Sequence, residues 1–247
     1  MAANRRENLL LAALPQRERK RLEPFLQPVE VRLSEVLIAP HQPINQIFFP
    51  YDAVTSTLQK LNHDLTIETG LMGVEGMIGI QFWLGMPSTS TETIVQVAGN
   101  GHRMNVKDFK REVMGKPKSK LNTLIGRYIH AFLAMTSQVA ACNRVHTFDQ
   151  RMCRWLKLLH NRIRRDQFPM RQNFMAQMLG VQRPTVSIAA NTLQKAGLIA
   201  YSRGEMKIID SKGLSAGACE CLELIEREFD RIFDHPWRTL TQKVDKR

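Results

Sequence analysis

The stretch that decides the fold runs from Arg171 to Leu193 and reads RQNFMAQMLGVQRPTVSIAANTL. Apolar residues recur at three- and four-residue spacing on both sides of Gly180-Val181-Gln182, which predicts two short amphipathic helices that meet at a steep angle. Pro184 falls near the start of the second helix, where its missing N–H removes no intrahelical hydrogen bond. The stretch therefore predicts a helix-turn-helix.

The residues that follow predict a wing. Residues 198–201 and 206–209 are short β-compatible runs, and Ser202-Arg203-Gly204-Glu205 joins them with a glycine where a positive φ is needed. A purely structural pair of packed helices would imitate a helix-turn-helix, so the wing and the charge are the features that favour the winged interpretation.

The charge of the chain is concentrated on the same segment. The 247 residues have a formal net charge of +12. Residues 144–212 carry 13 Lys/Arg against 4 Asp/Glu, whereas residues 1–143 carry 16 against 12 and residues 213–247 carry 6 against 7. This distribution indicates a polyanionic partner that the helix-turn-helix would contact. Charge alone would also fit an anionic membrane surface.

In these residues the chain resembles the Crp/Fnr superfamily of bacterial transcription regulators. The resemblance rests on the following residues and their spacing: Arg171-Gln172, Gly180, Arg183-x-Thr185-Val186, Leu193 and Gly197-Leu198-Ile199. It implies that Arg171, Gln172 and Thr185 hold DNA phosphates and that Arg183 reads a base.

Two departures from the family pattern bear on the DNA sequence that is read. Pro184 and Ile188 stand where the cyclic-AMP receptor proteins of this family carry a glutamate and a second arginine, so we expect a different operator. The expected DNA-binding residues are Arg171, Gln172, Gln182, Arg183, Pro184, Thr185, Ser187, Ile188 and Arg203.

The first half of the chain changes from a helical lead-in over residues 4–26 to short alternating runs. These runs, punctuated by Pro, Gly, Asn and Asp, predict an antiparallel barrel or roll, which the resemblance identifies as a cyclic-nucleotide-binding β-roll. The runs are 29–33, 36–38, 47–49, 54–56, 65–69, 94–97 and 103–106. The predicted fold class is therefore α+β, with a β-roll, a long dimerisation helix and a C-terminal winged helix-turn-helix. The expected boundaries are 1–117, 118–143, 144–212 and 213–247.

The pocket of the roll departs from the family pattern. Met77 stands where the ribose-binding glutamate is expected, and Thr91-Glu92-Thr93 replaces the Arg-Ser-Ala triplet that binds the phosphate. Losing a charge-assisted bond and adding a repulsive carboxylate costs about 3 kcal/mol or more, so ordinary cyclic-AMP binding is not expected. A packed roll without ligand and an apolar ligand that touches Met77, Phe82, Trp83 and Met86 both stay open. The degenerate pocket comprises Gly76, Met77, Ile78, Gly79, Phe82, Trp83, Thr91, Glu92 and Thr93.

Residues 118–143 carry a heptad pattern that predicts a dimer helix. Apolar residues recur there with alternating steps of four and three, which is the pattern that pairs two helices along their length. A single helix packed on its own roll remains the alternative, because further apolar residues widen the stripe. The expected dimer interface is Leu121, Ile125, Tyr128, Phe132, Met135, Val139 and Cys142.

The cysteines predict neither disulfides nor a metal site. Cys142, Cys153, Cys219 and Cys221 do not have the pattern of a disulfide framework in a chain of this length. The Cys219-x-Cys221 pair lacks a second pair or a nearby histidine at zinc spacing, and the chain has no amino-terminal cysteine cluster of the iron–sulfur Fnr type. Reduced, packed thiols are expected, with no metal and no cofactor.

The rest of the chain adds fewer signals. Residues 162–166 form a basic connector whose arginines are candidate phosphate contacts. Residues 215–233 are predicted to form a closing helix. The end of the chain from residue 236 is expected to be loose. No run approaches the roughly 18 apolar residues that span a bilayer, and we expect a cytoplasmic protein without membrane contact.

The favoured function is a sequence-specific transcription regulator that binds double-stranded DNA as a homodimer on an inverted repeat. The family resemblance adds RNA polymerase as a protein partner and leaves the effector unidentified. The alternatives are a non-specific or architectural DNA-binding protein and a ligand-sensing module with only general nucleic-acid affinity. An enzyme is not expected, because the sequence holds no Gly-rich phosphate loop, His-Glu-x-x-His helix or nucleophile elbow.

Overall fold

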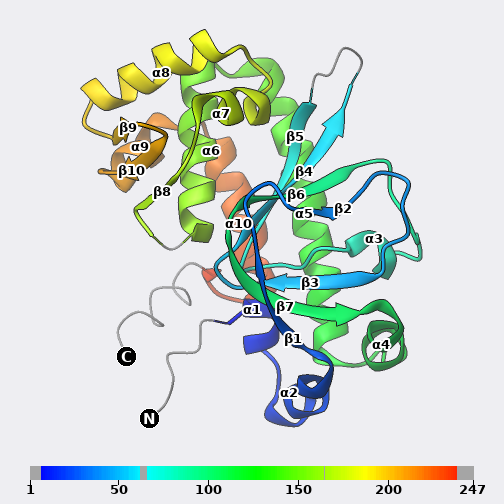
Figure 1. Cartoon of the computed structure of the whole chain (residues 1–247). Coiled ribbons are helices and arrows are strands. Elements are labelled where there is room, and N and C mark those ends of the chain that lie inside the picture. Colours follow the sequence, from blue (N-terminus) through cyan, green and yellow to red (C-terminus); the bar gives the residue numbers. More distant parts are fainter. Residues whose placement is uncertain (1–6, 62–65, 164, 238–247) are drawn as a thin grey trace.

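The computed structural model describes residues 7–61, 66–163 and 165–237. It has the predicted α+β class, with antiparallel sheets first, one long helix in the middle and a helix-turn-helix near the C-terminus (Figure 1). The chain begins with three short helical segments, α1 (Leu9–Ala12), α2 (Gln16–Leu22) and η1 (Glu23–Phe25). The predicted helical lead-in thus consists of three short helical segments.

The β-roll consists of two antiparallel sheets. One has the order β1-β7-β3 and the other the order β2-β6-β4-β5. Each of the seven predicted runs overlaps one strand, because short alternating or continuously apolar runs bounded by turn residues favour strands. The strands are β1 (Gln27–Val31), β2 (Val36–Ile38), β3 (Gln46–Pro50), β4 (Val54–Lys60), β5 (Thr66–Met72), β6 (Glu92–Val97) and β7 (Gly99–Asn105). Helix α3 (Ile80–Trp83) precedes β6, and α4 (Val106–Phe109) and η2 (Lys110–Met114) follow β7.

The long helix α5 (Lys120–Val145) packs between the roll and the last helix, α10 (Cys221–Phe233). The Ser119 hydroxyl caps its first turn by accepting a hydrogen bond of 3.2 Å from the Asn122 N–H. The Glu18 carboxylate of α2 accepts two more from the Lys120 and Leu121 N–H groups, both at 3.1 Å. A negative charge at this end also complements the helix dipole.

The predicted dimer seam on α5 faces the inside of its own protomer. Six of its seven side chains are at most 8% exposed in the single chain, and the seventh, Val139, is partly buried. The stripe is wide enough to cover both β5 and α10, so its buried residues are used within one chain. The seam assignment is therefore corrected for Leu121, Ile125, Tyr128, Phe132, Met135 and Cys142, and Val139 stays a prediction.

The closing segment forms two helices instead of the single predicted one. α9 (Ser211–Gly217) packs on α6 (Phe148–Ile163), and α10 then turns back along α5. The end is also less loose than predicted, because Trp237 is 1% exposed and its ring lies 6.4 Å from that of Phe229. Residues 238–247 lie outside the described residues.

The winged domain contains α7 (Gln172–Leu179), α8 (Arg183–Lys195) and a sheet of order β8-β10-β9. The two predicted wing runs are β9 (Ile199–Ser202) and β10 (Glu205–Ile208), and β8 (Gln167–Pro169) was not predicted. Pairing with β10 makes β8 a strand, and the neighbouring sequence gives no signal for that pairing. Gly180 ends α7 with a φ of 65° and lies against Ile67, so the helix-turn-helix touches the roll.

A buried ion pair joins the roll to α6. The Arg162 Nε lies 2.8 Å from the Glu75 Oε1, and both side chains are fully buried. The guanidinium also donates to the Leu158 carbonyl and lies over the rings of Phe229 and Trp237, 5.1 and 5.5 Å from their centroids. Arg162 is therefore corrected from a phosphate contact to an internal one, whereas Arg164 lies outside the described residues.

Candidate nucleic-acid interface

Helix α8 presents a polar face to solvent because its apolar residues are confined to the opposite side. Val186, Ala189, Ala190 and Leu193 are at most 4% exposed, whereas Ile188 is 70% exposed. Pro184 occupies the first turn, as predicted. The exposed face begins with Gln182 and Arg183 and includes Thr185. A helix held by one side in this way can enter a groove with the other.

The wing is a tight hairpin with an arginine at its tip. Arg203 and Gly204 have φ angles of 51° and 84°, and Ser202 pairs directly with Glu205. Two central residues with positive φ are the geometry of a type I′ turn, which matches the twist of the two strands. The turn therefore projects the exposed Arg203 side chain beyond the sheet.

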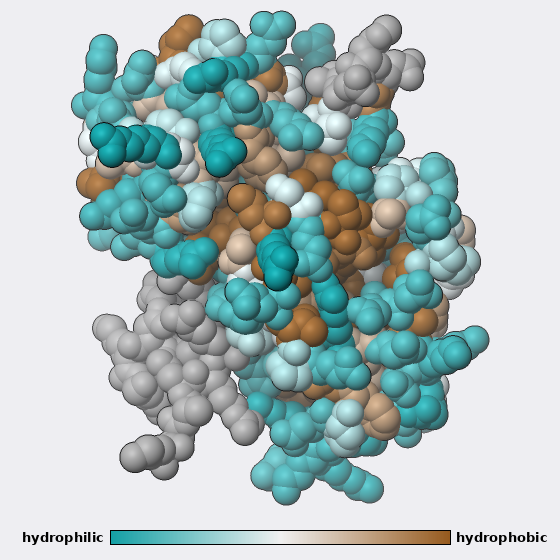
Figure 2. Space-filling view, in the orientation of Figure 1, coloured by the Kyte–Doolittle hydropathy of each residue, from teal (hydrophilic) through white to brown (hydrophobic). Residues whose placement is uncertain are grey.

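Three arginines from three elements converge on one groove. Arg171 caps α7, Arg183 begins α8 and Arg203 lies at the wing tip. The residues that line this groove are Arg171, Gln172, Asn173, Arg183, Tyr201, Arg203 and Gly204, and none of them is acidic. Guanidinium groups bind phosphate oxygens in a bidentate manner, so the groove suits a nucleic-acid backbone. In Figure 2 the outer surface of the winged domain, called the head below, is mostly hydrophilic.

The structure brings most of the predicted DNA-binding residues to this surface. Seven of the nine predicted residues are exposed: Arg171, Gln182, Arg183, Pro184, Thr185, Ile188 and Arg203. Gln172 and Ser187 are half-buried, since the Ser187 hydroxyl donates a hydrogen bond of 2.7 Å to the Gln172 Oε1. That bond joins α7 to α8 and fixes their angle.

Two residues of the groove, Asn173 and Tyr201, were missed by the sequence reasoning. Asn173 lies in the first turn of α7, directly after the family motif. Tyr201 lies on β9, where an aromatic residue was counted only as a strand former. Both could have been found by asking which polar side chains flank the three arginines.

The predicted effector pocket is packed with side chains from α5. A Cβ added to Gly76 would lie 2.2 Å from the Tyr128 ring, and one added to Gly70 would lie 2.5 Å from the Phe132 ring. Met77 and Ile78 are at most 1% exposed. The two aromatic rings thus occupy the space beside the strand and loop where the family would hold a ligand.

The other predicted pocket side chains are engaged by neighbours. The Trp83 Nε1 donates to the Asn122 Oδ1 at 2.6 Å, and the Phe82 ring lies 6.4 Å from that of Phe109. The Glu92 Oε1 lies 3.2 Å from the Lys60 Nζ. Thr91 is half-buried, and Thr93 and Gly79 are buried. These contacts favour the packed-roll alternative.

The chain is similar in sequence and in fold to known regulators. Residues 150–216 match the family model of the Crp-like helix-turn-helix domain. No curated protein matches the sequence. The helices of the described residues include none that is long and apolar enough to cross a membrane.

Three solved structures illustrate the shared fold. A transcriptional regulator of the CRP family from Thermus thermophilus has a TM-score of 0.61 at 14% identity, covering 77% of this chain and 96% of that one. The c-di-GMP responsive global regulator CLP from Xanthomonas campestris has a TM-score of 0.62 at 14% identity, covering 79% and 100%. A CooA variant from Carboxydothermus hydrogenoformans has a TM-score of 0.58 at 13% identity, covering 85% and 94%.

A β-roll followed by a long helix and a winged head with an arginine-lined groove defines a DNA-binding transcription regulator. Residues 150–216 are thus similar to the Crp-like helix-turn-helix domain, and the chain shares the fold of the three regulators described above.

Proposed function

We propose that the protein is a sequence-specific regulator that binds an inverted-repeat DNA site as a homodimer. The groove between Arg171, Arg183 and Arg203 carries this proposal. Arg183 lies at the start of α8, where a recognition helix contacts base edges, and we assign it the reading of one base. Arg171 and Arg203 flank it and hold phosphates, so they supply affinity instead of sequence preference.

The homodimer is proposed to form through the side of α5 that its own chain leaves uncovered. Leu133, Ser137 and Ala140 are exposed at four- and three-residue spacing, and Leu133 is 57% exposed. α10 covers a different side of the same helix. Pairing of these exposed sides would give a two-fold dimer and set the two recognition helices about 34 Å apart, one turn of B-DNA.

The signal is proposed to be something other than ordinary cyclic AMP. Tyr128 and Phe132 fill the space beside Gly76 and Gly70, and a carboxylate, Glu92, follows Thr91 at the expected phosphate position. RNA polymerase is the proposed protein partner by family resemblance. We further propose a cytoplasmic location and no catalytic activity.

The test is selection of binding sites from a random duplex pool, followed by gel-shift titration of Arg183→Ala on the selected site and on scrambled DNA. Loss of a base contact should weaken specific binding by about 1–3 kcal/mol and remove the preference at one position of each half-site. Arg203→Ala is the matched control, since a lost phosphate contact weakens both duplexes alike.

A general or architectural DNA-binding protein gives a different result. Selection would then enrich no sequence, and Arg183→Ala would behave like Arg203→Ala on every duplex. That outcome would overturn the proposal of specific recognition.

A further inference from the structure

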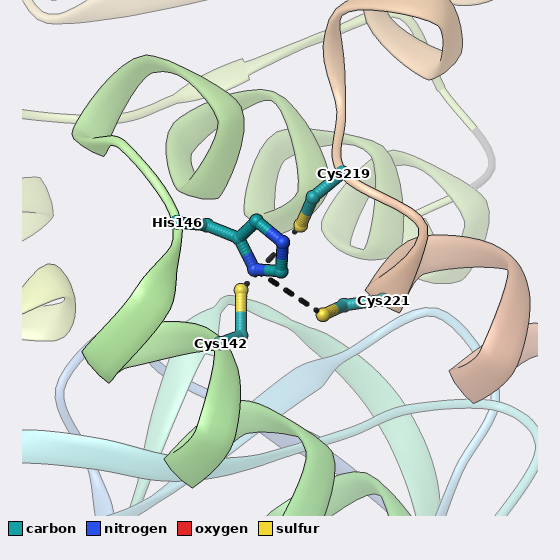
Figure 3. Close-up of side chains that lie close together, drawn as sticks. All are labelled: Cys142, His146, Cys219 and Cys221. Atoms are coloured by element: carbon teal, nitrogen blue, oxygen red, sulfur yellow. Dashed lines mark hydrogen bonds between the residues drawn. The ribbon is translucent and has the colours of Figure 1, made fainter.

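A cluster of three cysteines and one histidine lies where α5 meets the start of α10. Cys142 and His146 are one turn apart at the end of α5, and Cys219 and Cys221 flank the residue that caps α10. The sulfur atoms and a ring nitrogen of these residues all lie within 4.8 Å of one another. Figure 3 shows the four side chains converging from the two segments.

Two of the separations between ligand atoms match those of a single tetrahedral metal ion, and the other atoms lie within 4.8 Å of one another. The Cys142 and Cys219 Sγ atoms are 3.5 Å apart, and the Cys221 Sγ is 3.6 Å from the His146 Nδ1. A zinc ion with Zn–S of about 2.3 Å and Zn–N of about 2.0 Å needs ligand atoms about 3.5–3.8 Å apart. Iron–sulfur clusters spread their cysteines over several iron atoms, so this compact arrangement fits one ion better.

The outer contacts of the cluster orient its ligands. The His146 Nε2 lies 3.1 Å from the Glu220 Oε1, which leaves the Nδ1 facing the sulfur atoms. The Gln138 Nε2 donates to the Cys221 Sγ at 3.0 Å. A histidine that binds a metal typically donates its other N–H to a carboxylate, and ligand sulfurs typically accept hydrogen bonds. All three cysteines are buried, which excludes competing solvent.

We propose that Cys142, His146, Cys219 and Cys221 form a zinc-binding site. Thiolate and imidazole ligands select zinc over the hard cations magnesium and calcium. Four protein ligands leave no open position, so the site is structural and not catalytic. Binding displaces the three thiol protons to solvent, and no oxidation or reduction is involved.

The sequence reasoning missed this site because its ligands are distant along the chain. Cys219-x-Cys221 was set aside for want of a nearby histidine, yet the return of α10 along α5 brings His146 and Cys142 to the pair. Only the spacing Cys142-x-x-x-His146 at the end of one predicted helix could have drawn attention to these two further ligands.

The proposed ion links the C-terminal end of α5 to the start of α10. This link lies next to the joint, the short segment that connects α5 with α6 and the winged domain. α6 starts two residues after His146, and Arg151 of α6 donates a 2.9 Å hydrogen bond to the carbonyl of Leu179 in the helix-turn-helix. Metal binding therefore fixes the joint from which the winged domain extends. Any effect on DNA affinity rests on the proposed function, whereas metal binding itself does not.

The test is the metal content of the full-length protein purified under anaerobic conditions without DNA. We expect one zinc ion per protomer by inductively coupled plasma mass spectrometry. Cobalt replacing the zinc should show the ligand-field and thiolate charge-transfer bands of a tetrahedral site. Cys219→Ser and His146→Ala should lose the metal, whereas His146→Cys should keep it because a site of four cysteine thiolates also binds zinc.

Cys153→Ala is the matched control, since Cys153 is a buried free cysteine of α6 outside the cluster, and it should retain the metal. Folded wild-type protein without zinc, or with iron and sulfide in its place, would overturn the proposal. So would full zinc content in Cys219→Ser. These readouts need no DNA, so a failure of DNA binding leaves them interpretable.

Discussion

Glu68 is half-buried where β5 meets α6. It accepts hydrogen bonds from the Trp155 Nε1 at 3.0 Å and from the Ser56 hydroxyl at 2.7 Å. Burial raises the pKa of Glu68 to about 7 from its ordinary value of 4.5, and the two hydrogen bonds lower it by less. The folded protein therefore holds a proton on Glu68 at acidic pH that the unfolded chain has already released.

Glu68 is expected to make the fold less stable as the pH rises. Because its pKa is raised in the folded state, its contribution to stability is fully present below pH 4.5 and is lost by pH 7. Since a tenfold difference in proton affinity corresponds to about 1.4 kcal/mol, the loss is at most about 3.5 kcal/mol. Glu68→Gln mimics the protonated form and should raise Tm more at about pH 8 than at about pH 5.

Thermal unfolding at the two pH values measures this difference. Glu30→Gln, which changes an exposed carboxylate on β1, is the matched control and should not reproduce the trend. An equal gain in stability from Glu68→Gln at both pH values would contradict the assignment.

Gly76 is expected to tolerate no larger side chain. Its missing Cβ leaves the space that the Tyr128 ring occupies, at 2.2 Å from where a Cβ would lie. Gly76→Ala should lower the free energy of unfolding by about 1–3 kcal/mol, because the buried ring must shift. Denaturant unfolding of Gly76→Ala, Tyr128→Leu and the double variant measures the coupling. Strictly additive losses would show that the ring and the glycine are independent.

At the level of elements, the strands and helices themselves could be predicted far better than the partners against which their apolar faces pack. The β-branched residues of β4 and the turn residues around it are local signals, so the strands follow from the sequence. The apolar stripe of α5 was equally visible. Whether it faces a partner or α10 depends on a helix that follows some 75 residues later, and no local pattern encodes that choice. The metal cluster was hidden for the same reason.

The exposed side of α5 gives a prediction about assembly. Leu133→Glu places a charge in the proposed dimer contact and should shift the protein from dimer to monomer in analytical ultracentrifugation, with weaker binding to the full operator. Leu33→Glu is the matched control, because Leu33 is 50% exposed but follows β1, away from α5. An unchanged dimer in Leu133→Glu would place the contact elsewhere.

Most of the net positive charge of the molecule lies on the segment that contains the winged domain. Residues 144–212 have a net charge of +9, which is 13 Lys/Arg against 4 Asp/Glu, out of a total of +12. Association with DNA should therefore weaken steeply with salt. The head is held against the roll by the contact of Gly180 with Ile67 and by the pair of Arg162 with Glu75. Such a fixed head predicts a strict distance between the two half-sites.

Inserting half a turn of DNA, about 5 base pairs, between the selected half-sites should abolish dimer binding, because the second half-site then faces away from the second head. Titration of the parent and lengthened duplexes measures the loss. Mutating one half-site outright is the control that gives the affinity of a single head. Equal affinity for both spacings would show that the heads act independently.

The return of α10 to α5 (Figure 1) bears on how the protein is made. The rings of Phe229 and Tyr128 lie 6.4 Å apart, although α10 is the last helix to be synthesised among the described residues. The nascent chain must carry an uncovered apolar ridge on its middle while the ribosome finishes the rest. That ridge can be covered only after α10 has left the ribosome.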